Sequence, residues 1–204
     1  PYHLVIIPIV HSPEKSDEIH RFAGQIKEKL SALFYGEERV QVFCDKRDLR
    51  GGEKSWGWIK KGVPLRLEVG LREIESGRFP LMRRDKPHKE SLSLTIEELE
   101  HKVPSLLEEI QENLYQKALA FRKANTHRID SHEEFIRFFA DEAEGGGFAL
   151  CHWNGDAAIE AKVKEELNVT IRCIPLDETM TGGPGRCLFT GEPSPRRVLF
   201  AKAY

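Results

Sequence analysis

Two apolar segments separated by one amphipathic segment constrain the fold of this chain most strongly. The run HLVIIPIV at residues 3–10 is continuously apolar and rich in β-branched residues, which is typical of a strand covered on both faces. Apolar residues then recur at helical spacing until Gly36, and RVQVFC at residues 39–44 predicts a second strand. A helix between two such strands is a βαβ crossover, so the strands are expected to be parallel neighbours.

The following segments extend this sheet. In VPLRLEVG, at residues 63–70, strict alternation places Leu65, Leu67 and Val69 on one face of a strand and Arg66 and Glu68 on the other. Further strands are predicted at 77–85 and 90–96, and at best a short helix at 52–62. We therefore expect residues 1–100 to form a mixed sheet with flanking helices, about four strands and two helices in all.

A long helix and a second small α/β domain are expected beyond this point. Thr95 and Glu98 have capping-box spacing before an amphipathic pattern, which predicts a linker helix over residues 101–129. Ser131 and Glu134 repeat that spacing at the start of the next helix. The remaining pattern predicts strands at 147–153, 169–175 and 198–203, with a helix before the second of them. Residues 130–204 should form the second domain.

The composition is that of a globular protein without a membrane span. The chain has 204 residues, 40% hydrophobic residues and a net charge of −2, and no apolar run approaches the roughly 20 residues that a spanning helix needs. Its four cysteines are scattered, which argues against a disulfide framework and indicates reduced thiols. Because the chain starts at Pro1 without a signal-like segment, we interpret it as a piece of a longer cytoplasmic protein.

The charge is distributed unevenly. Residues 39–89 contain 14 Lys and Arg against 7 Asp and Glu, whereas the rest of the chain contains 17 against 26. A local basic field favours a polyanion, because cationic side chains that neutralise phosphates release condensed counterions. An ordinary solvated surface is the alternative interpretation of the same charges.

The loop that leaves the second strand carries the candidate ligand-binding side chains. Ligands of parallel α/β sheets collect beyond the carboxyl ends of strands, and Asp45, Arg47, Arg50 and Lys54 follow such an end. Arginine suits guanine or phosphate, and an acidic neighbour accepts from base amino groups. Trp56 is a candidate for stacking on unpaired bases. Packing against the sheet is the alternative for both tryptophans of this stretch, and it is favoured for Trp58.

The order of these motifs resembles a known enzyme family. VIIPIV, CDKRDLRGGEKSWGWIKKGVPLRLEVG, TIRCIP and GRCLFTGEPSPRRVLFAKAY together resemble the C-terminal part of prolyl-tRNA synthetases of the archaeal/eukaryotic-like group, from end to end. The resemblance implies an anticodon-binding domain followed by a C-terminal domain. It also implies a class II catalytic domain upstream, whose motifs this sequence lacks, so this piece alone should be inactive.

The resemblance assigns roles to particular residues. It implies that Arg66 lies near the anticodon bases, with Arg72 and Lys89 lining the same face. An exposed strand charge paired with Glu68 or Glu73 is the alternative interpretation of Arg66. Ile59 stands where family members typically have a glutamate, which puts the contact to one anticodon guanine in doubt. The resemblance also implies that Tyr204 reaches towards the catalytic domain, whereas a frayed terminus is favoured for the isolated piece.

The family's zinc site is expected to be lost. In zinc-bearing relatives four cysteines occupy the places that match Asn154, Ile159, Cys187 and Thr190 here, so one thiol of four remains. A structural zinc site needs four donors in tetrahedral array. Cys151 and His152 are close in sequence, but neighbours on a strand point to opposite faces. An apolar cluster around Ile159 is expected to supply stability in place of the metal.

Two functions of different classes follow. The first is recognition of the proline tRNA anticodon, which serves a homodimeric, ATP- and Mg-dependent cytoplasmic ligase, with no cofactor bound by this piece. The second is a freestanding α/β protein that binds a nucleotide or small anion, with Arg47 and Lys54 as phosphate ligands. The second predicts a Gly-rich loop after the first strand, and VHSPEK has no glycine there, which favours the first.

Overall fold

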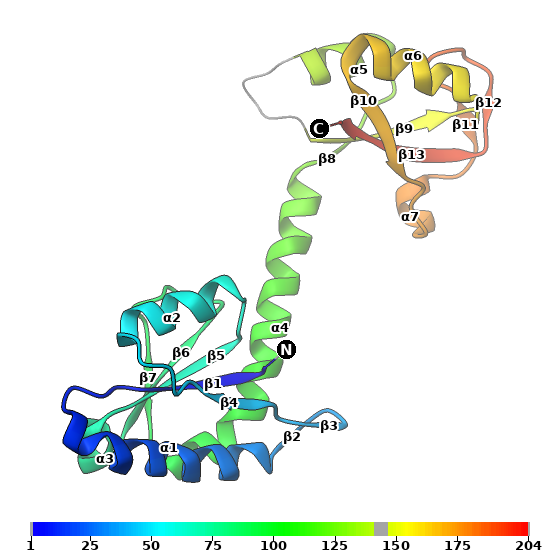
Figure 1. The fold of residues 1–204 in the computed structure, drawn as a ribbon. Helices are drawn as coiled ribbons and strands as arrows, with labels where there is room; N and C mark the ends of the chain where they lie inside the picture. The colour runs from blue at the N-terminus through cyan, green and yellow to red at the C-terminus, as the bar shows by residue number, and fades with distance from the viewer. Residues whose placement is uncertain (1, 141–146, 204) are drawn as a thin grey trace. The chain divides into compact units, whose positions relative to one another are not determined.

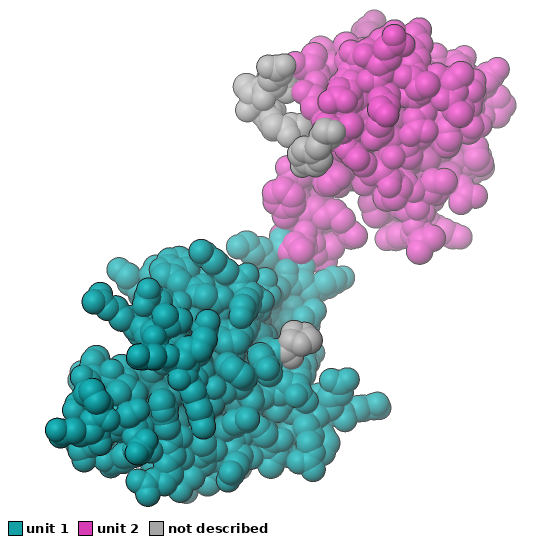
Figure 2. Space-filling view, viewed as in Figure 1, with its two compact units in different colours: residues 1–117 teal, residues 118–204 magenta. Residues whose placement is uncertain are grey.

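The chain forms two compact units, each with its own sheet and its own hydrophobic core. A computed structural model describes residues 2–140 and 147–203. The two units comprise residues 1–117 and 118–204 and are coloured separately in Figure 2. Tyr204, to which the resemblance assigned a role, lies outside the described residues. The predicted α/β class, with a long helix and a second small α/β domain, is confirmed. None of the helices in the described ranges has the length and apolar character that a membrane crossing requires.

Unit 1 is a five-stranded mixed sheet with helices on both faces (Figure 1). Its elements are β1 (Leu4–Pro8), η1 (Pro13–Lys15), α1 (Ser16–Ser31), β2 (Phe34–Tyr35), β3 (Glu38–Arg39), β4 (Val42–Cys44), α2 (Gly51–Lys60), β5 (Leu65–Val69), α3 (Leu71–Ser76), β6 (Phe79–Arg83), β7 (Leu92–Leu94) and most of α4 (Ile96–Ala124). The strand order is β4-β1-β5-β6-β7, in which β4 and β5 are parallel to β1 while β6 and β7 pair antiparallel to their neighbours. The predicted parallel βαβ unit is therefore present.

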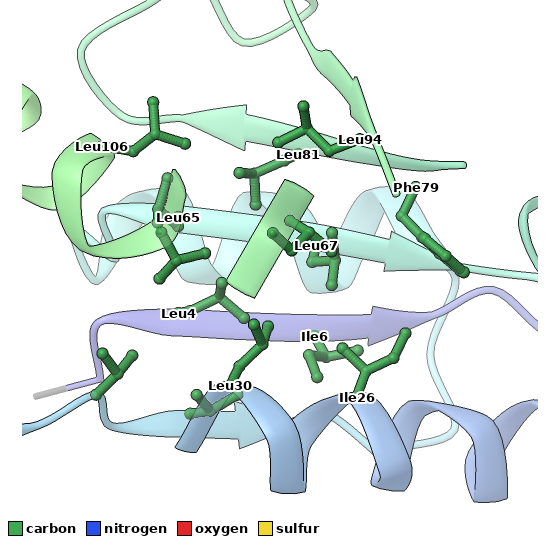
Figure 3. Packing of buried hydrophobic residues seen from close by; sticks show 14 of the residues in the cluster. Leu4, Ile6, Ile26, Leu30, Leu65, Leu67, Phe79, Leu81, Leu94 and Leu106 are labelled. Atoms are coloured by element: carbon green, nitrogen blue, oxygen red, sulfur yellow. The ribbon is translucent and has the colours of Figure 1, made fainter. Parts of the chain in front are cut away.

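The alternation of β5 decides which helices cover which face. Leu65, Leu67 and Val69 point into the larger core, where they meet α1 and the first half of α4 (Figure 3). The opposite face of β1 carries Val5 and Ile7, which pack with Trp58 of α2. Arg66 and Glu68 lie on the α2 face because residues alternate along a strand. Helix α2 thus covers the face of the sheet on which Arg66 lies.

Unit 1 contains more elements than the sequence predicted. The segment predicted as one strand at 39–44 is divided between a two-residue hairpin strand, β3, and β4, because Tyr35 and Glu38 close a tight turn at Gly36. Helix α3 was not predicted. Glu73 accepts a hydrogen bond from the backbone N–H of Gly70 and caps this short helix, which ends at Gly77 in the left-handed conformation.

Helix α4 begins as its capping box predicts. The Thr95 hydroxyl accepts from the Glu98 N–H at 3.2 Å, and the Glu98 carboxylate accepts from the Thr95 N–H at 2.8 Å. The helix starts at Ile96 rather than at 101, and its buried residues all lie within its first half: Leu99, Val103, Leu106, Leu107 and Ile110. This half therefore forms part of the unit 1 core, and the division between the units falls inside the helix, after Lys117.

Unit 2 is built on a four-stranded sheet. Its elements are the end of α4, β8 (Thr126–Arg128), α5 (His132–Ala140), β9 (Phe148–Trp153), α6 (Ala157–Leu167), β10 (Val169–Cys173), α7 (Glu178–Thr181), β11 (Gly185–Arg186), β12 (Pro193–Ser194) and β13 (Arg196–Lys202). The sheet order is β10-β13-β9-β8, in which β13 is antiparallel to both of its neighbours and β8 is parallel to β9. Strand β8 was not predicted, because the linker helix was expected to continue through it.

The core of unit 2 depends on aromatic side chains. Phe200 of β13 lies edge-to-face with Phe135 of α5, and Phe189 contacts both rings at centroid distances of 5.2 and 5.8 Å. Phe139 adds a further edge-to-face contact to Phe135. Such pairs contribute about 0.5–1.5 kcal/mol each beyond the burial of their area.

A partly buried ion-pair network joins β6 to α4 within unit 1. The Arg83 guanidinium donates to Asp85 at 2.8 and 2.9 Å and to Glu109 of α4 at 2.7 Å. Asn113 of α4 donates to the same Asp85 carboxylate at 2.7 Å. These hydrogen bonds, with the one from Arg83 foremost, lower the pKa of Asp85 to about 2. The carboxylate therefore stabilises the folded state as long as it is ionised.

We expect this network to make unit 1 sensitive to acid. The folded pKa of Asp85 lies below its ordinary value, so the stabilisation is present above about pH 4 and is lost as the pH falls towards 2. Replacing Asp85 by Asn should lower the free energy of unfolding at neutral pH by about 2 kcal/mol and flatten its pH dependence in that window. Urea unfolding monitored by circular dichroism measures both effects. Glu37→Gln, an exposed change in the hairpin turn, is the control.

We also expect the two cores to be destabilised separately. Phe200→Ala removes the central ring of the unit 2 cluster and should cost that unit about 3–5 kcal/mol through lost burial and a cavity. Amide hydrogen exchange should then accelerate in β9 and β13 and stay unchanged in β1 and β5, whose core contains no unit 2 residue. Equal acceleration in both sheets would contradict the division into two cores.

Candidate RNA-binding surface

Helix α2 positions several basic and aromatic residues of the segment 44–70. Lys54 and Trp58 are four residues apart, share one side of the helix and are both buried against the sheet. Trp56 lies on another side and is 56% exposed. The favoured prediction for Trp58, packing on the sheet, is thus confirmed, and Trp56 is the tryptophan available to a ligand.

Asp45 anchors this helix to the end of β4. Its fully buried carboxylate accepts a hydrogen bond from the Trp58 indole N–H at 2.7 Å and two from the Arg47 guanidinium at 2.6 and 2.8 Å. The Arg47 hydrogen bond is the largest cause that lowers the pKa of Asp45 to about 2, and the Trp58 bond adds to it. Asp45 was predicted among residues that face a ligand, but the structure commits both of its oxygens to internal partners.

Arg47 is held by the same arrangement. Its guanidinium packs over the Trp58 ring at 5.7 Å from the centroid, and the Lys61 ammonium lies 4.3 Å from that centroid. Both contacts are cation–π interactions, which stabilise cations over the indole face. The Arg47 side chain stays half exposed, so its free edge still faces solvent at the strand end.

Arg66 is buried and forms no direct ion pair in the described residues. It is 2% exposed, and its guanidinium makes one side-chain hydrogen bond, from Nη1 to the Ser55 hydroxyl of α2 at 3.2 Å. Its Nε is buried with no acceptor, and no carboxylate lies within 4 Å of it in the described ranges. Burial lowers the pKa of Arg66, and Glu68 partly opposes this shift. A buried cation without a directly hydrogen-bonded carboxylate is costly, so this site is not optimised for stability alone.

Arg66 contacts α2 through Ser55, and the next residue of that helix, Trp56, contacts the loop between β6 and β7. Trp56 stacks on His88, with ring centroids 5.8 Å apart and an interplanar angle of 28°. Lys89 follows His88 and is exposed. We call Ser55, Trp56, Arg66, His88 and Lys89 the α2-face surface. At its low exposure, Arg66 can contact a ligand only after neighbouring side chains move.

The seven predicted site residues therefore fall into separate places. The α2-face surface contains Trp56, Arg66 and Lys89, whereas Asp45, Arg47 and Lys54 lie where β4 ends and α2 begins. Arg72 is exposed at the start of α3, beyond the carboxyl end of β5. Sequence reasoning missed Ser55 and His88. His88 stands in a charged loop, RRDKPHKE, where an imidazole gave no separate signal.

The residues that match the zinc-binding cysteines of the resembled family make other contacts in this structure. The Asn154 amide donates to Glu192 at 2.7 Å, and Ile159 packs against the unit 2 core. Burial raises the pKa of Cys187, but hydrogen bonds from Thr190 and from nearby backbone N–H groups outweigh it, so the pKa is lowered overall. Residues 2–140 and 147–203 contain no cluster of three or more His, Cys, Asp or Glu suited to a metal.

Comparisons with known proteins agree with this architecture. A family model of the anticodon binding domain matches residues 3–106, and a model described as prolyl-tRNA synthetase, C-terminal, matches residues 136–204. The chain is 45% identical over 213 residues to proline–tRNA ligase 2 of Anaeromyxobacter dehalogenans and 42% identical over 205 residues to the proline–tRNA ligase of Porphyromonas gingivalis. Both matches cover 100% of this chain.

The same matches cover only part of the relatives. The chain spans 41% of the length of the Anaeromyxobacter dehalogenans protein and 39% of that of the Porphyromonas gingivalis protein. A third proline–tRNA ligase, from Cytophaga hutchinsonii, is 43% identical over 205 residues, again with 39% of its length covered. With an anticodon binding domain in unit 1 and the C-terminal domain in unit 2, the chain belongs to the prolyl-tRNA synthetase family, of which it represents the C-terminal part.

Proposed function

We propose that this chain is the tRNA-binding portion of a proline–tRNA ligase and that the α2-face surface recognises the anticodon of proline tRNA. The observation that supports this most directly is Arg66, a buried guanidinium with an unpartnered Nε and no ion pair within 4 Å in the described part of unit 1. A guanidinium donates two parallel hydrogen bonds to N7 and O6 of guanine, which makes arginine the commonest reader of that base. An anticodon guanine would supply the acceptors that Arg66 lacks.

The neighbouring side chains suit a single-stranded loop. Sequence-specific RNA recognition generally targets unpaired bases, which stack on aromatic side chains. Trp56 and His88 offer such a platform next to Ser55, which holds Arg66. Lys89 and the other exposed cations of its loop, Arg84 and Lys86, would neutralise backbone phosphates. Recognition would then combine base reading at Arg66 with stacking and charge around it.

The remaining functions of the whole enzyme are part of this proposal. A class II catalytic domain, upstream in the same chain, would bind ATP and Mg and join proline to the tRNA, while this portion binds no cofactor and is inactive alone. The assembled enzyme would be a homodimer in the cytoplasm. The full coverage of this chain by curated proline–tRNA ligases supports these assignments.

The alternative, a freestanding nucleotide- or anion-binding protein, has weaker support. That class commonly holds phosphate on backbone N–H groups of a Gly-rich loop after the first strand. The segment after β1, IVHSPEK, contains no glycine. Family membership accounts for both units, whereas the alternative leaves unit 2 without a role.

We expect Arg66 to affect recognition and stability in opposite directions. Arg66→Met should weaken binding of proline tRNA by about 1–3 kcal/mol, because base-directed hydrogen bonds are lost. The same change should preserve or raise the free energy of unfolding, because it removes a buried, unpaired charge. Filter binding and urea unfolding measure the two effects. Arg21→Met, on an exposed position of α1, is the matched control.

The tRNA used in that assay decides the role of Arg66. A transcript whose anticodon guanines are replaced should bind wild-type protein more weakly and should show no further loss with Arg66→Met. An equal loss for cognate and altered tRNA would refute base reading. A large loss of stability in the variant would indicate instead that Arg66 is a structural residue.

We further propose that the C-terminal unit folds without zinc. Ile159 occupies one of the matching cysteine positions and packs against the unit 2 core, which supports an apolar replacement of the metal. Metal analysis of protein purified without chelators should find far less than one zinc per chain, and EDTA should leave the thermal midpoint unchanged. One equivalent of zinc, or a lower midpoint in EDTA, would overturn the proposal.

A further inference from the structure

A cleft of about 800 Å³ opens where the chain leaves β1 and β4. These strands are parallel neighbours, but α1 packs on one face of the sheet and α2 on the other. Their outgoing loops therefore diverge, and such a switch point is where open α/β sheets bind ligands. The volume lies in the range of small-molecule sites. The cleft is formed by other residues than the α2-face surface and lies at the carboxyl ends of the strands.

Cationic side chains outnumber carboxylates in the lining of this cleft. Lys46, Arg47, Arg50 and Lys54 line it, against Asp48 as the one carboxylate in the lining that the structure describes. Asp45 lies close by, but Arg47 and Trp58 occupy its oxygens. The Arg50 side chain makes no ion pair within 4 Å in the described ranges, although it is exposed. The cleft thus carries a net positive charge that internal partners do not neutralise.

Lys54 is the strongest indication of a ligand. It is 3% exposed, and its ammonium donates one weak hydrogen bond, to the Pro8 carbonyl at 3.4 Å. No carboxylate lies within 4 Å of it in the part of the chain that the structure describes. Burying an ammonium group without a counter-ion is unfavourable. His20, which also lines the cleft, has a buried Nε2 with no hydrogen-bond partner. A bound anion would offset the cost at Lys54 and give His20 a partner.

Apolar side chains at the same cleft narrow the class of anion. Val10 and Leu49 are both exposed large hydrophobic residues, and both line the cleft beside the cations. An inorganic anion leaves such side chains in water, whereas a phosphate ester with a flat ring system covers them. The first turn of α2 also borders the cleft at Gly51, and a helix N-terminus favours negative charge.

We propose that this cleft is a second site of the chain and binds a nucleoside monophosphate, with Lys54 and Arg50 on the phosphate and Val10 and Leu49 against the nucleoside. Side chains would hold the phosphate here, so the site does not need the Gly-rich loop whose absence after β1 argues against a nucleotide-binding protein of the usual kind. The proposal does not rest on anticodon recognition, since it uses none of the α2-face residues.

Titration of the whole 204-residue chain with adenosine 5′-monophosphate, followed by amide chemical shifts, tests the site. Saturable shifts are expected at residues 46–54 and around Val10, and inorganic phosphate should shift the same amides with lower affinity. Adenosine, which lacks the phosphate, should cause none. Lys54→Met and Arg50→Gln should each weaken the nucleotide affinity about tenfold or more, because each removes a charge-assisted hydrogen bond.

Lys60→Gln is the matched control, because Lys60 is exposed on the last turn of the same helix and does not line the cleft. Its affinity for the nucleotide should equal that of the wild type. If Lys54→Met fails to fold, the nucleotide affinity of Arg50→Gln, a change at an exposed position, tests the proposal instead. Absence of saturable shifts, or unchanged affinity in Arg50→Gln, would overturn the proposal. The proposal would also be overturned if Lys54→Met and Arg50→Gln weakened the binding of tRNA but not that of the nucleotide, since the cleft would then contact an RNA backbone.

Discussion

The hydrogen bond between the Trp58 indole and the buried Asp45 carboxylate attaches α2 to the end of β4, and the ligand-binding part of unit 1 is arranged around this attachment. It joins the residue that follows β4 to the last turn of α2, on the face of the sheet where β1 carries Val5 and Ile7. With α2 fixed in this way, Ser55 is placed over Arg66, and Trp56 is turned outward towards His88. The same attachment holds the first turn of α2 beside the loop after β1. One buried carboxylate thus positions both candidate sites.

Comparison of the buried cations separates structural from functional roles. Arg83 is buried with two carboxylates, and these hydrogen bonds favour its charged form. Arg66 and Lys54 are also buried, but neither has a carboxylate within 4 Å or a full set of acceptors in the described structure. Unpaired buried charge is removed easily by mutation when it has no use, because apolar replacements are usually neutral or stabilising. Its presence at two positions of one small domain supports the two proposed binding sites.

Patterns that depend on neighbouring residues could be predicted from the sequence. The alternation of β5 correctly assigned Arg66 to the face opposite Leu65 and Leu67, and the spacing of Thr95 and Glu98 located the start of α4. Short elements were missed, since the six residues of α3 and the three of β8 give too little periodicity to detect. Helix α3 had a local signal in the Glu73 cap after Gly70, which was not used.

The geometry of the site could be predicted only in part. Asp45, Arg47 and Lys54 are polar and follow a strand, so sequence reasoning placed them all at a ligand; tertiary contacts decide that Asp45 is internal. No local pattern shows that a tryptophan thirteen residues later will take its oxygen. The division of the basic residues between a sheet face and the strand ends likewise depends on the direction in which α2 crosses the sheet, which neither charge nor spacing specifies.

The contrast between the two tryptophans of α2 gives the molecule a natural optical reporter. Trp58 is sealed against β1, with its N–H on a carboxylate and cations over its ring, whereas Trp56 is open to water beside an imidazole. The indole emission of unit 1 therefore has a shielded component and one that iodide can quench. Only the second can change when a base is laid on the α2-face surface, so occupancy there can be followed by fluorescence without an added dye.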